Sequence, residues 1–154
     1  MARVRGSIDI ERPVDEVFDV VADQTNEPLY NPAMTDSRRL DDGPIGVGTR
    51  FLATVLTRGK PHEVEIEVTD FERPTEIATQ SVMGRSTVSG RVRFDPVGSG
   101  TRLSWDWDVQ VGMGAGVLGP LVSAIGRRQE RAIWGGLKHF LEDGAARPSR
   151  EGRA

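Results

Sequence analysis

The sequence contains no cysteine, and among its 154 residues it has only two lysines, two histidines and one tyrosine. The absence of cysteine excludes disulfide bonds, thiol catalysis and cysteine-ligated zinc or iron–sulfur sites. The two histidines, His62 and His139, lie far apart in the chain, so no metal site is expected. A histidine general base would require one of them to face a cavity.

Long hydrophobic runs are also absent. The longest uncharged stretch covers residues 109–126, and it contains five glycines and a proline, too polar a composition for a membrane span. Residues 1–6 carry two arginines with no apolar segment behind them, so no secretory signal is expected. These features predict a cytoplasmic protein without a transmembrane segment.

Neither sign of charge dominates. The formal net charge is -3, with 28% charged and 37% hydrophobic residues. This balance is typical of a globular domain and argues against a nucleic-acid partner. The length predicts one domain over residues 1–143, followed by a polar, flexible tail over residues 144–154.

Several catalytic motifs are missing as well. The sequence has no Gly-x-Ser-x-Gly nucleophile elbow, no Walker loop and no His-Glu-x-x-His helix, so hydrolase and kinase functions have no support. Gly114-x-Gly116-x-x-Gly119 resembles a dinucleotide fingerprint, but the chain offers no parallel strand after the following helix. We therefore expect no cofactor and interpret these glycines as a flexible connection near a cavity mouth.

What the sequence does contain is a long series of alternating segments. Residues 3–11 predict a first strand, and Pro13 with Asp15 and Glu16 predicts the start of a helix over residues 14–22. A loop or single helical turn follows around Tyr30. Further strands are predicted over residues 36–40, 49–56, 63–68, 76–82, 87–94 and 101–111, and a long helix over residues 120–142.

Residues 101–111 give the clearest strand pattern. Trp105 and Trp107 fall on its apolar face, and Asp106 and Asp108 fall on the opposite face. The two tryptophans fit either a packed core or a cavity wall. The two aspartates are expected to be solvated and to face arginines 91 and 93 across a hairpin, rather than to act as an acid–base pair.

These elements predict an α+β fold. An antiparallel sheet of six or seven strands has one apolar face to cover, and only one long helix is available, so the sheet must curve around that helix. A small helix or helix pair follows the first strand. The short, polar edge strand over residues 36–40 predicts a monomer or a weak homodimer.

The ordered set of motifs resembles the SRPBCC superfamily, also called START-like or Bet v 1-like, and within it the bacterial polyketide cyclase/dehydrase-like proteins. The residues that carry the resemblance are 8–18, Tyr30-Asn31-Pro32 (where tryptophan is more usual than tyrosine), 94–105 and 137–142. The resemblance implies a helix-grip fold with a cavity between the sheet and the C-terminal helix. It also implies binding of hydrophobic or amphipathic small molecules such as lipids, polyketides and hormones.

The inward-facing residues of these elements are the candidates for the cavity lining. Tyr30 and Gln129 are the polar members, and either is expected to contact protein, water or ligand. Arginines 127, 128 and 131 fit a solvated helix face, or else contact with an anionic head group. No residue is assigned a catalytic role. The candidates are Phe18, Tyr30, Phe51, Val55, Phe94, Trp105, Trp107, Met113, Val122, Ile125, Gln129 and Ile133.

Three functions remain open at this point. The first is binding or carrying a lipid-like or polyketide-like molecule, which rests on the expected cavity. The second is a polyketide cyclase or dehydratase, which would be favoured by an acid–base pair pointing into the cavity. The third is a ligand-free protein-interaction or stress module, which would be favoured by a cavity closed by side chains.

Overall fold

The computed structural model describes residues 2–111 and 119–144, and in the last helix it describes the side chains of residues 126–143. Seven strands, two α-helices, a 3₁₀ helix and a π-helical segment make up this part of the chain. In chain order they are β1 (Ala2–Ile10), α1 (Val14–Ala22), η1 (Gln24–Leu29), β2 (Met34–Arg39), β3 (Arg50–Thr57), β4 (Lys60–Glu72), β5 (Glu76–Met83), β6 (Ser86–Val97), β7 (Gly100–Gln110), α2 (Gly119–His139) and η3 (Phe140–Gly144).

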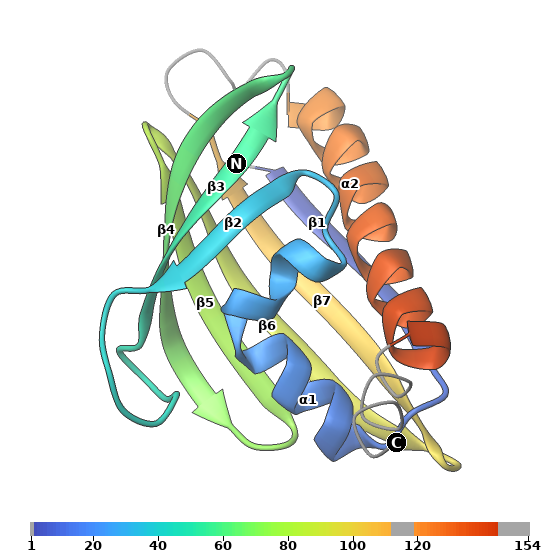
Figure 1. Ribbon diagram of the computed structural model, residues 1–154. Coiled ribbons are helices and arrows are strands. Elements are labelled where there is room, and N and C mark those ends of the chain that lie inside the picture. The colour runs from blue at the N-terminus through green and yellow to red at the C-terminus, as the bar shows by residue number, and fades with distance from the viewer. Residues whose placement is uncertain (1, 112–118, 145–154) are drawn as a thin grey trace.

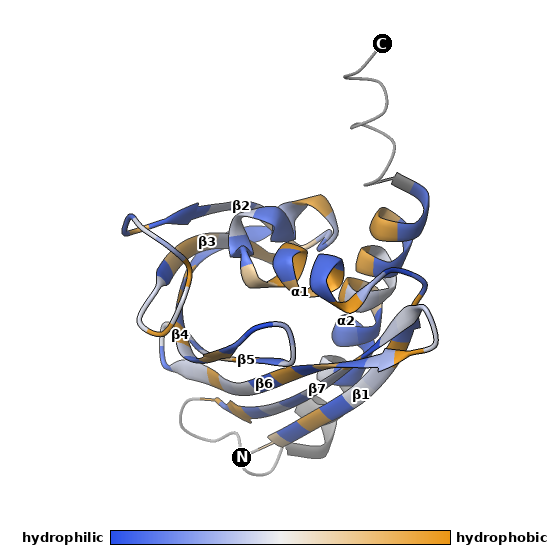
Figure 2. Ribbon diagram, turned by 90° about the horizontal axis from the view of Figure 1, so that it is seen from below, coloured by the Kyte–Doolittle hydropathy of each residue, from blue (hydrophilic) through white to orange (hydrophobic). Residues whose placement is uncertain are grey.

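The seven strands form one antiparallel sheet in the order β1-β7-β6-β5-β4-β3-β2. Strands β2 to β6 each pair with the next strand along the chain, and β1 completes the sheet by pairing with β7. The sheet curves, and α1 and α2 lie on its concave side (Figures 1 and 2). This arrangement confirms the α+β helix-grip fold expected from the sequence. No helix in the described ranges is long and apolar enough to span a membrane.

Helix α1 has the bounds predicted from its sequence pattern. Pro13 precedes the first turn, and Asp15 and Glu16 lie within that turn, where carboxylates favour the positive end of the helix dipole. Val17, Phe18 and Val21 recur at helical spacing and are buried. The buried face therefore anchors α1 against the sheet and sets where the next segment, η1, begins.

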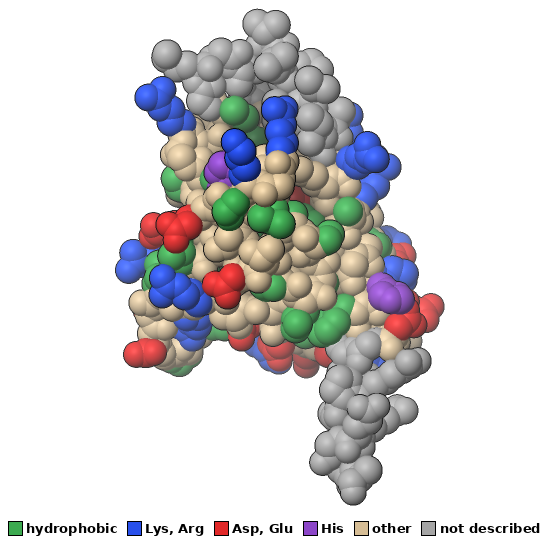
Figure 3. All heavy atoms as spheres, turned by 45° about the horizontal axis from the view of Figure 1, so that its top comes forward, with side chains coloured by type: hydrophobic (Ala, Val, Ile, Leu, Met, Phe, Trp, Pro, Cys, Tyr) green, Lys and Arg blue, Asp and Glu red, His purple; other side chains and the backbone are tan. Residues whose placement is uncertain are grey.

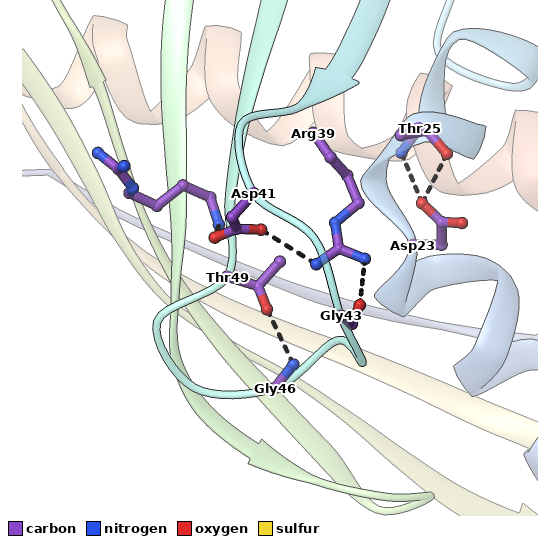
Figure 4. Close-up of polar contacts among 8 residues, drawn as sticks. Asp23, Thr25, Arg39, Asp41, Gly43, Gly46 and Thr49 are labelled. Carbon is purple, nitrogen blue, oxygen red and sulfur yellow. Dashed lines mark hydrogen bonds and ion pairs between the residues drawn. The ribbon is translucent and has the colours of Figure 1, made fainter.

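The start of η1 is held by a side-chain cap. Asp23 Oδ1 accepts hydrogen bonds from the backbone nitrogen of Thr25 at 3.1 Å and from its hydroxyl at 2.6 Å (Figure 4). The same view shows the loop between β2 and β3, where Arg39 donates to Asp41 and to the carbonyl oxygen of Gly43. Both segments are thus ordered by local polar contacts rather than by apolar burial alone.

Strand β7 shows the predicted alternation, with Leu103 and Trp105 buried and Arg102 exposed. A glycine lies opposite each inward tryptophan: Gly6 on β1 pairs with Trp105, and Gly90 on β6 pairs with Trp107. A Cβ atom at Gly6 would collide with the Trp105 indole ring. Small neighbours on both sides therefore make room for two large rings on one strand.

Arg91 lies opposite Asp106 in the register of β6 and β7, as predicted, whereas Asp108 lies opposite Ser89 and not an arginine. The ion pairs of Asp106 are made with the other neighbouring strand. Asp106 accepts hydrogen bonds from Arg3 at 2.8 and 2.9 Å and from Arg5 at 3.4 Å, both on β1, and Arg91 instead pairs with Glu76 on β5. The reason is topological, because β7 lies between β6 and β1, and the sequence pattern revealed only the β6 neighbour. The expectation that Asp106 lies on the outer, solvated face is correct.

Helix α2 approaches its neighbours closely at two glycines. A Cβ at Gly126 would lie 2.7 Å from Val4 Cγ2 on β1, and a Cβ at Gly136 would collide with the carbonyl oxygen of Tyr30. Gly135, by contrast, has open space around its Cβ position. Helix α2 is continuous over Gly119–His139, and Gly126 and Gly136 mark points of close packing.

Candidate functional site

A cavity of about 260 Å³ lies between the concave face of the sheet, η1 and α2. An apolar cavity of about 150 Å³ can hold benzene, so this one has room for a larger molecule. Most of its wall is aliphatic, and its polar groups come from η1, the segment after it, β5 and α2. The lining residues are Val21, Gln24, Glu27, Asn31, Met34, Val55, Val64, Ile66, Ile77, Thr79, Ser81, Val88, Val92, Trp107, Glu130, Ile133 and Trp134.

A second hollow of about 230 Å³ adjoins the first. Val88, Trp107 and Glu130 line both spaces, and Gly126 and Gln129 line the second one only. The contact between Trp107 and Glu130 therefore stands between the two hollows. A movement of the Trp107 or Glu130 side chain would therefore change whether a ligand can extend from the first hollow into the second.

Glu130 is the central polar group of the site. Its Oε2 atom accepts hydrogen bonds from the indole nitrogens of Trp107 at 3.0 Å and of Trp134 at 2.7 Å. Trp134 lies one turn further along α2, and Trp107 reaches across from β7. Burial raises the pKa of the Glu130 carboxyl, and the two indole N–H groups act in the opposite direction.

Glu27 supplies a second carboxyl group from η1. Its Oε1 atom accepts a hydrogen bond of 2.8 Å from the amide of Asn31. Burial raises the pKa of Glu27 to about 7; the Asn31 hydrogen bond opposes this, and the negative charge of Glu130 adds to it. At neutral pH, protonated and ionised Glu27 are therefore both well populated, which suits a group that gives and takes protons.

Tyr30 packs beside this pair rather than in the cavity wall. Its ring stacks on Trp134 with centroids 6.4 Å apart, and Trp134 stacks in turn on Trp105 at 5.8 Å. Burial, followed by the charges of Glu27 and Glu130, raises the pKa of the Tyr30 phenol. The stack fixes the orientation of Trp134, and with it the direction from which Trp134 donates to Glu130.

The structure divides the residues proposed from the sequence into three groups. Val55, Trp107 and Ile133 line the cavity, and Gln129 is an exposed residue that lines the second hollow. Met113 lies outside the described residues, as do the side chains of Val122 and Ile125. The remaining candidates are buried in the core next to the cavity: Phe18, Tyr30, Phe51, Phe94 and Trp105.

The polar half of the site was not predicted from the sequence. Gln24, Glu27 and Asn31 lie in a segment broken by proline, where no periodic pattern marks an inward side. Glu130 did carry a signal, because it precedes Ile133 by three residues and Trp134 by four and thus shares their helix face. Its arginine neighbours at 127, 128 and 131 are exposed, which agrees with the solvated face expected for them.

Neither histidine takes part in the site. His62 is exposed on β4, and His139 is exposed and pairs with Asp143 at 2.8 Å. Figure 3, where histidine is purple, shows histidine side chains at the surface. A histidine general base in the cavity is therefore excluded. No group of three or more histidine, aspartate or glutamate side chains suited to a metal occurs in the described part of the chain.

Residues 1–142 match the family described as polyketide cyclase / dehydrase and lipid transport. The chain belongs to this family. Its membership agrees with a cavity enclosed by a curved sheet and a long helix, and it supports hydrophobic ligand binding or cyclase activity at the level of the family. Among curated proteins, none matches the sequence.

Solved structures share the fold at low sequence identity. A START superfamily protein from Mycobacterium smegmatis has a TM-score of 0.81 at 19% identity, over 92% of this chain and 98% of that one. The ZhuI aromatase/cyclase from Streptomyces sp. R1128 has a TM-score of 0.68 at 16% identity, over 92% and 96%. The di-domain aromatase/cyclase BexL has a TM-score of 0.76 at 18% identity, over 92% of this chain and 47% of that one.

Proposed function

We propose that the protein binds or carries a hydrophobic or amphipathic small molecule in the cavity between its sheet and α2. The observation that carries this proposal is the cavity itself, with its aliphatic wall on β3 to β6 and its polar groups gathered on η1, β5 and α2. Such a division is typical of ligand pockets, where apolar contacts give affinity and a few polar groups fix orientation. An open cavity also gives no support to a ligand-free interaction module.

The first test is native mass spectrometry of the purified protein, followed by extraction and identification of any bound molecule. We expect a co-purifying apolar compound, or a rise in melting temperature with members of a hydrophobic compound library, because a ligand of the folded state stabilises it by mass action. An empty protein that no library member stabilises would contradict the proposal.

A matched pair of variants on β6 sharpens this test. Val88 lines the cavity, whereas Val97 on the same strand is 41% exposed and lies outside it. We expect Val88→Phe to fill part of the cavity and weaken binding at least about tenfold, and Val97→Phe to leave binding unchanged. Equal affinities for the two folded variants would show that the ligand binds elsewhere.

A cyclase or dehydratase activity is the second candidate, and the carboxyl pair Glu27 and Glu130 favours it. Loss of water from a β-hydroxyketone requires a base to remove the proton next to the carbonyl and an acid to protonate the departing hydroxyl. Glu27 is suited to either role at neutral pH, because its pKa is about 7. The test is enone formation from an aromatic β-hydroxyketone, followed by absorbance, with Glu27→Gln expected to abolish it and the exposed Glu65→Gln to retain it.

A further inference from the structure

The charged groups of the cavity wall are all of one sign. Glu27 and Glu130 contribute carboxyl groups, and no arginine, lysine or histidine occurs among the described residues that line either hollow. The twenty basic residues of the chain are thus absent from the lining described here. A ligand that enters with a negative head group would meet like charge and no compensating cation.

Two further polar side chains of the cavity wall are available to a ligand. The side chains of Gln24 and Thr79 are 9% and 6% exposed, they line the cavity, and neither makes a side-chain hydrogen bond within residues 2–111 and 119–144. Buried polar groups normally have a hydrogen-bond partner. Both side chains line the open space of the cavity and can therefore hydrogen-bond a polar part of a ligand at this end, next to η1 and β5.

The aromatic groups of the wall point to the same chemistry. Trp107 and Trp134 both line the cavity, and both of their indole N–H groups are already used by Glu130. They offer the ligand aromatic ring surface and no further donor. A cation next to tryptophan rings and a carboxylate is a favourable arrangement in a site with little water.

We propose that the ligand is an apolar amine, whose ammonium group lies between Glu27 and Glu130 while its hydrocarbon part lies against the valine and isoleucine wall. This proposal rests on the proposed binding function and names its ligand class. An ammonium group supplies hydrogen-bond donors to the two carboxyl groups and to the Gln24 amide oxygen, all of which accept. A fatty acid of the same size has no cation to pair with in this lining.

The test compares three probes that share one hydrocarbon chain and differ only in the head group: octylamine, octanol and octanoate. Binding is measured by titration calorimetry at about pH 8, above the pKa of Glu27 of about 7, where an alkylammonium group stays protonated. We expect octylamine to bind at least about tenfold more tightly than octanol, and octanoate to bind most weakly.

Two variants and a matched control identify the groups responsible. Glu27→Gln and Glu130→Gln are each expected to reduce octylamine affinity at least about tenfold, and to reduce octanol affinity much less because octanol carries no charge. Glu65→Gln, on the exposed side of β4, is expected to change neither. Because two separate glutamates are tested, a fold defect in one variant does not remove the test.

The outcomes separate this inference from the function on which it rests. The amine proposal would be overturned if octylamine bound no more tightly than octanol, or if octanoate bound most tightly. Either result would leave the proposal of an apolar binding cavity standing. An octylamine preference that survives in both glutamate variants would also overturn it. Failure of all three probes to bind, together with an empty purified protein, would contradict both proposals.

Discussion

Trp107 on β7 and Glu130 on α2 are joined by a hydrogen bond of 3.0 Å between the indole nitrogen and Oε2. This contact links β7, the strand next to the edge strand β1, to the C-terminal helix at the boundary between the two hollows. Trp134 donates to the same oxygen at 2.7 Å, so one carboxylate oxygen collects two donors from two elements. Glu130 Oε2 therefore connects β7 and α2 at the wall of the cavity.

Removal of one of these donors should be measurable as a loss of stability. We expect Trp107→Phe to lower the free energy of unfolding by about 1.5–3 kcal/mol, since hydrogen bonds to charged groups contribute that much. The measurement is urea denaturation. In a Glu130→Leu background the same substitution should cost clearly less, and an equal cost in both backgrounds would mean that packing, and not the hydrogen bond, is responsible.

The raised pKa of Glu27 predicts a pH-dependent stability. Because the folded state retains a proton on Glu27 that the unfolded state has lost, the stability contribution is present below pH 4.5 and is lost as the pH rises to about 7. The total loss is on the order of 3 kcal/mol. The difference in unfolding free energy between wild type and Glu27→Gln should therefore shift with pH across this window. A constant difference would contradict the burial of this carboxyl group.

Adjacent glycines on α2 should respond in opposite directions to alanine. Gly135→Ala has open space and should stabilise the protein by about 0.5–1 kcal/mol through helix propensity. Gly136→Ala meets the Tyr30 carbonyl oxygen and should destabilise it by about 1–3 kcal/mol. Thermal and urea denaturation of both variants test this pair. A similar response at both positions would show that α2 does not approach Tyr30 so closely.

The cap of η1 should control the order of the segment that carries Gln24 and Glu27. We expect Asp23→Ala to cost about 1 kcal/mol and to speed hydrogen exchange of the η1 amides, because Thr25 loses both of its hydrogen bonds to the cap. Asp19→Ala removes only an exposed ion pair with Arg73 and serves as the control. Equal exchange rates in the two variants would rule out a role for the cap.

The sequence predicted the scaffold well because each strand repeats one simple pattern. Alternation on β7 identified its inward tryptophans, and proline with two acidic residues identified the start of α1. Strand β4 was predicted over residues 63–68 but spans Lys60–Glu72, because its two ends pair with different neighbours. The local sequence pattern contains no information about which neighbouring strand each end pairs with.

The sequence could not predict which inward-facing residues pack in the core and which line the cavity. Trp105 and Trp107 are equivalent by alternation, yet Trp105 is 4% exposed in the core and Trp107 lines both hollows. The difference arises from what faces each ring: Trp134 stacks on Trp105, whereas the space beside Trp107 is left open. The period of the strand predicts which side chains point inward, but it does not predict whether an inward side chain meets other side chains or an open cavity.

The sequence by itself determined the order of the elements, the apolar face of the sheet and the presence of one long helix to cover it, because these depend on periodicities of two and 3.6 residues. Only the tertiary structure decided that Glu27 and Glu130 meet at one cavity without a basic partner in its described lining. These residues are about a hundred positions apart, on η1 and α2, and their raised pKa values come from shared burial. Burial of a charge depends on every element that surrounds it, and no local pattern contains that information.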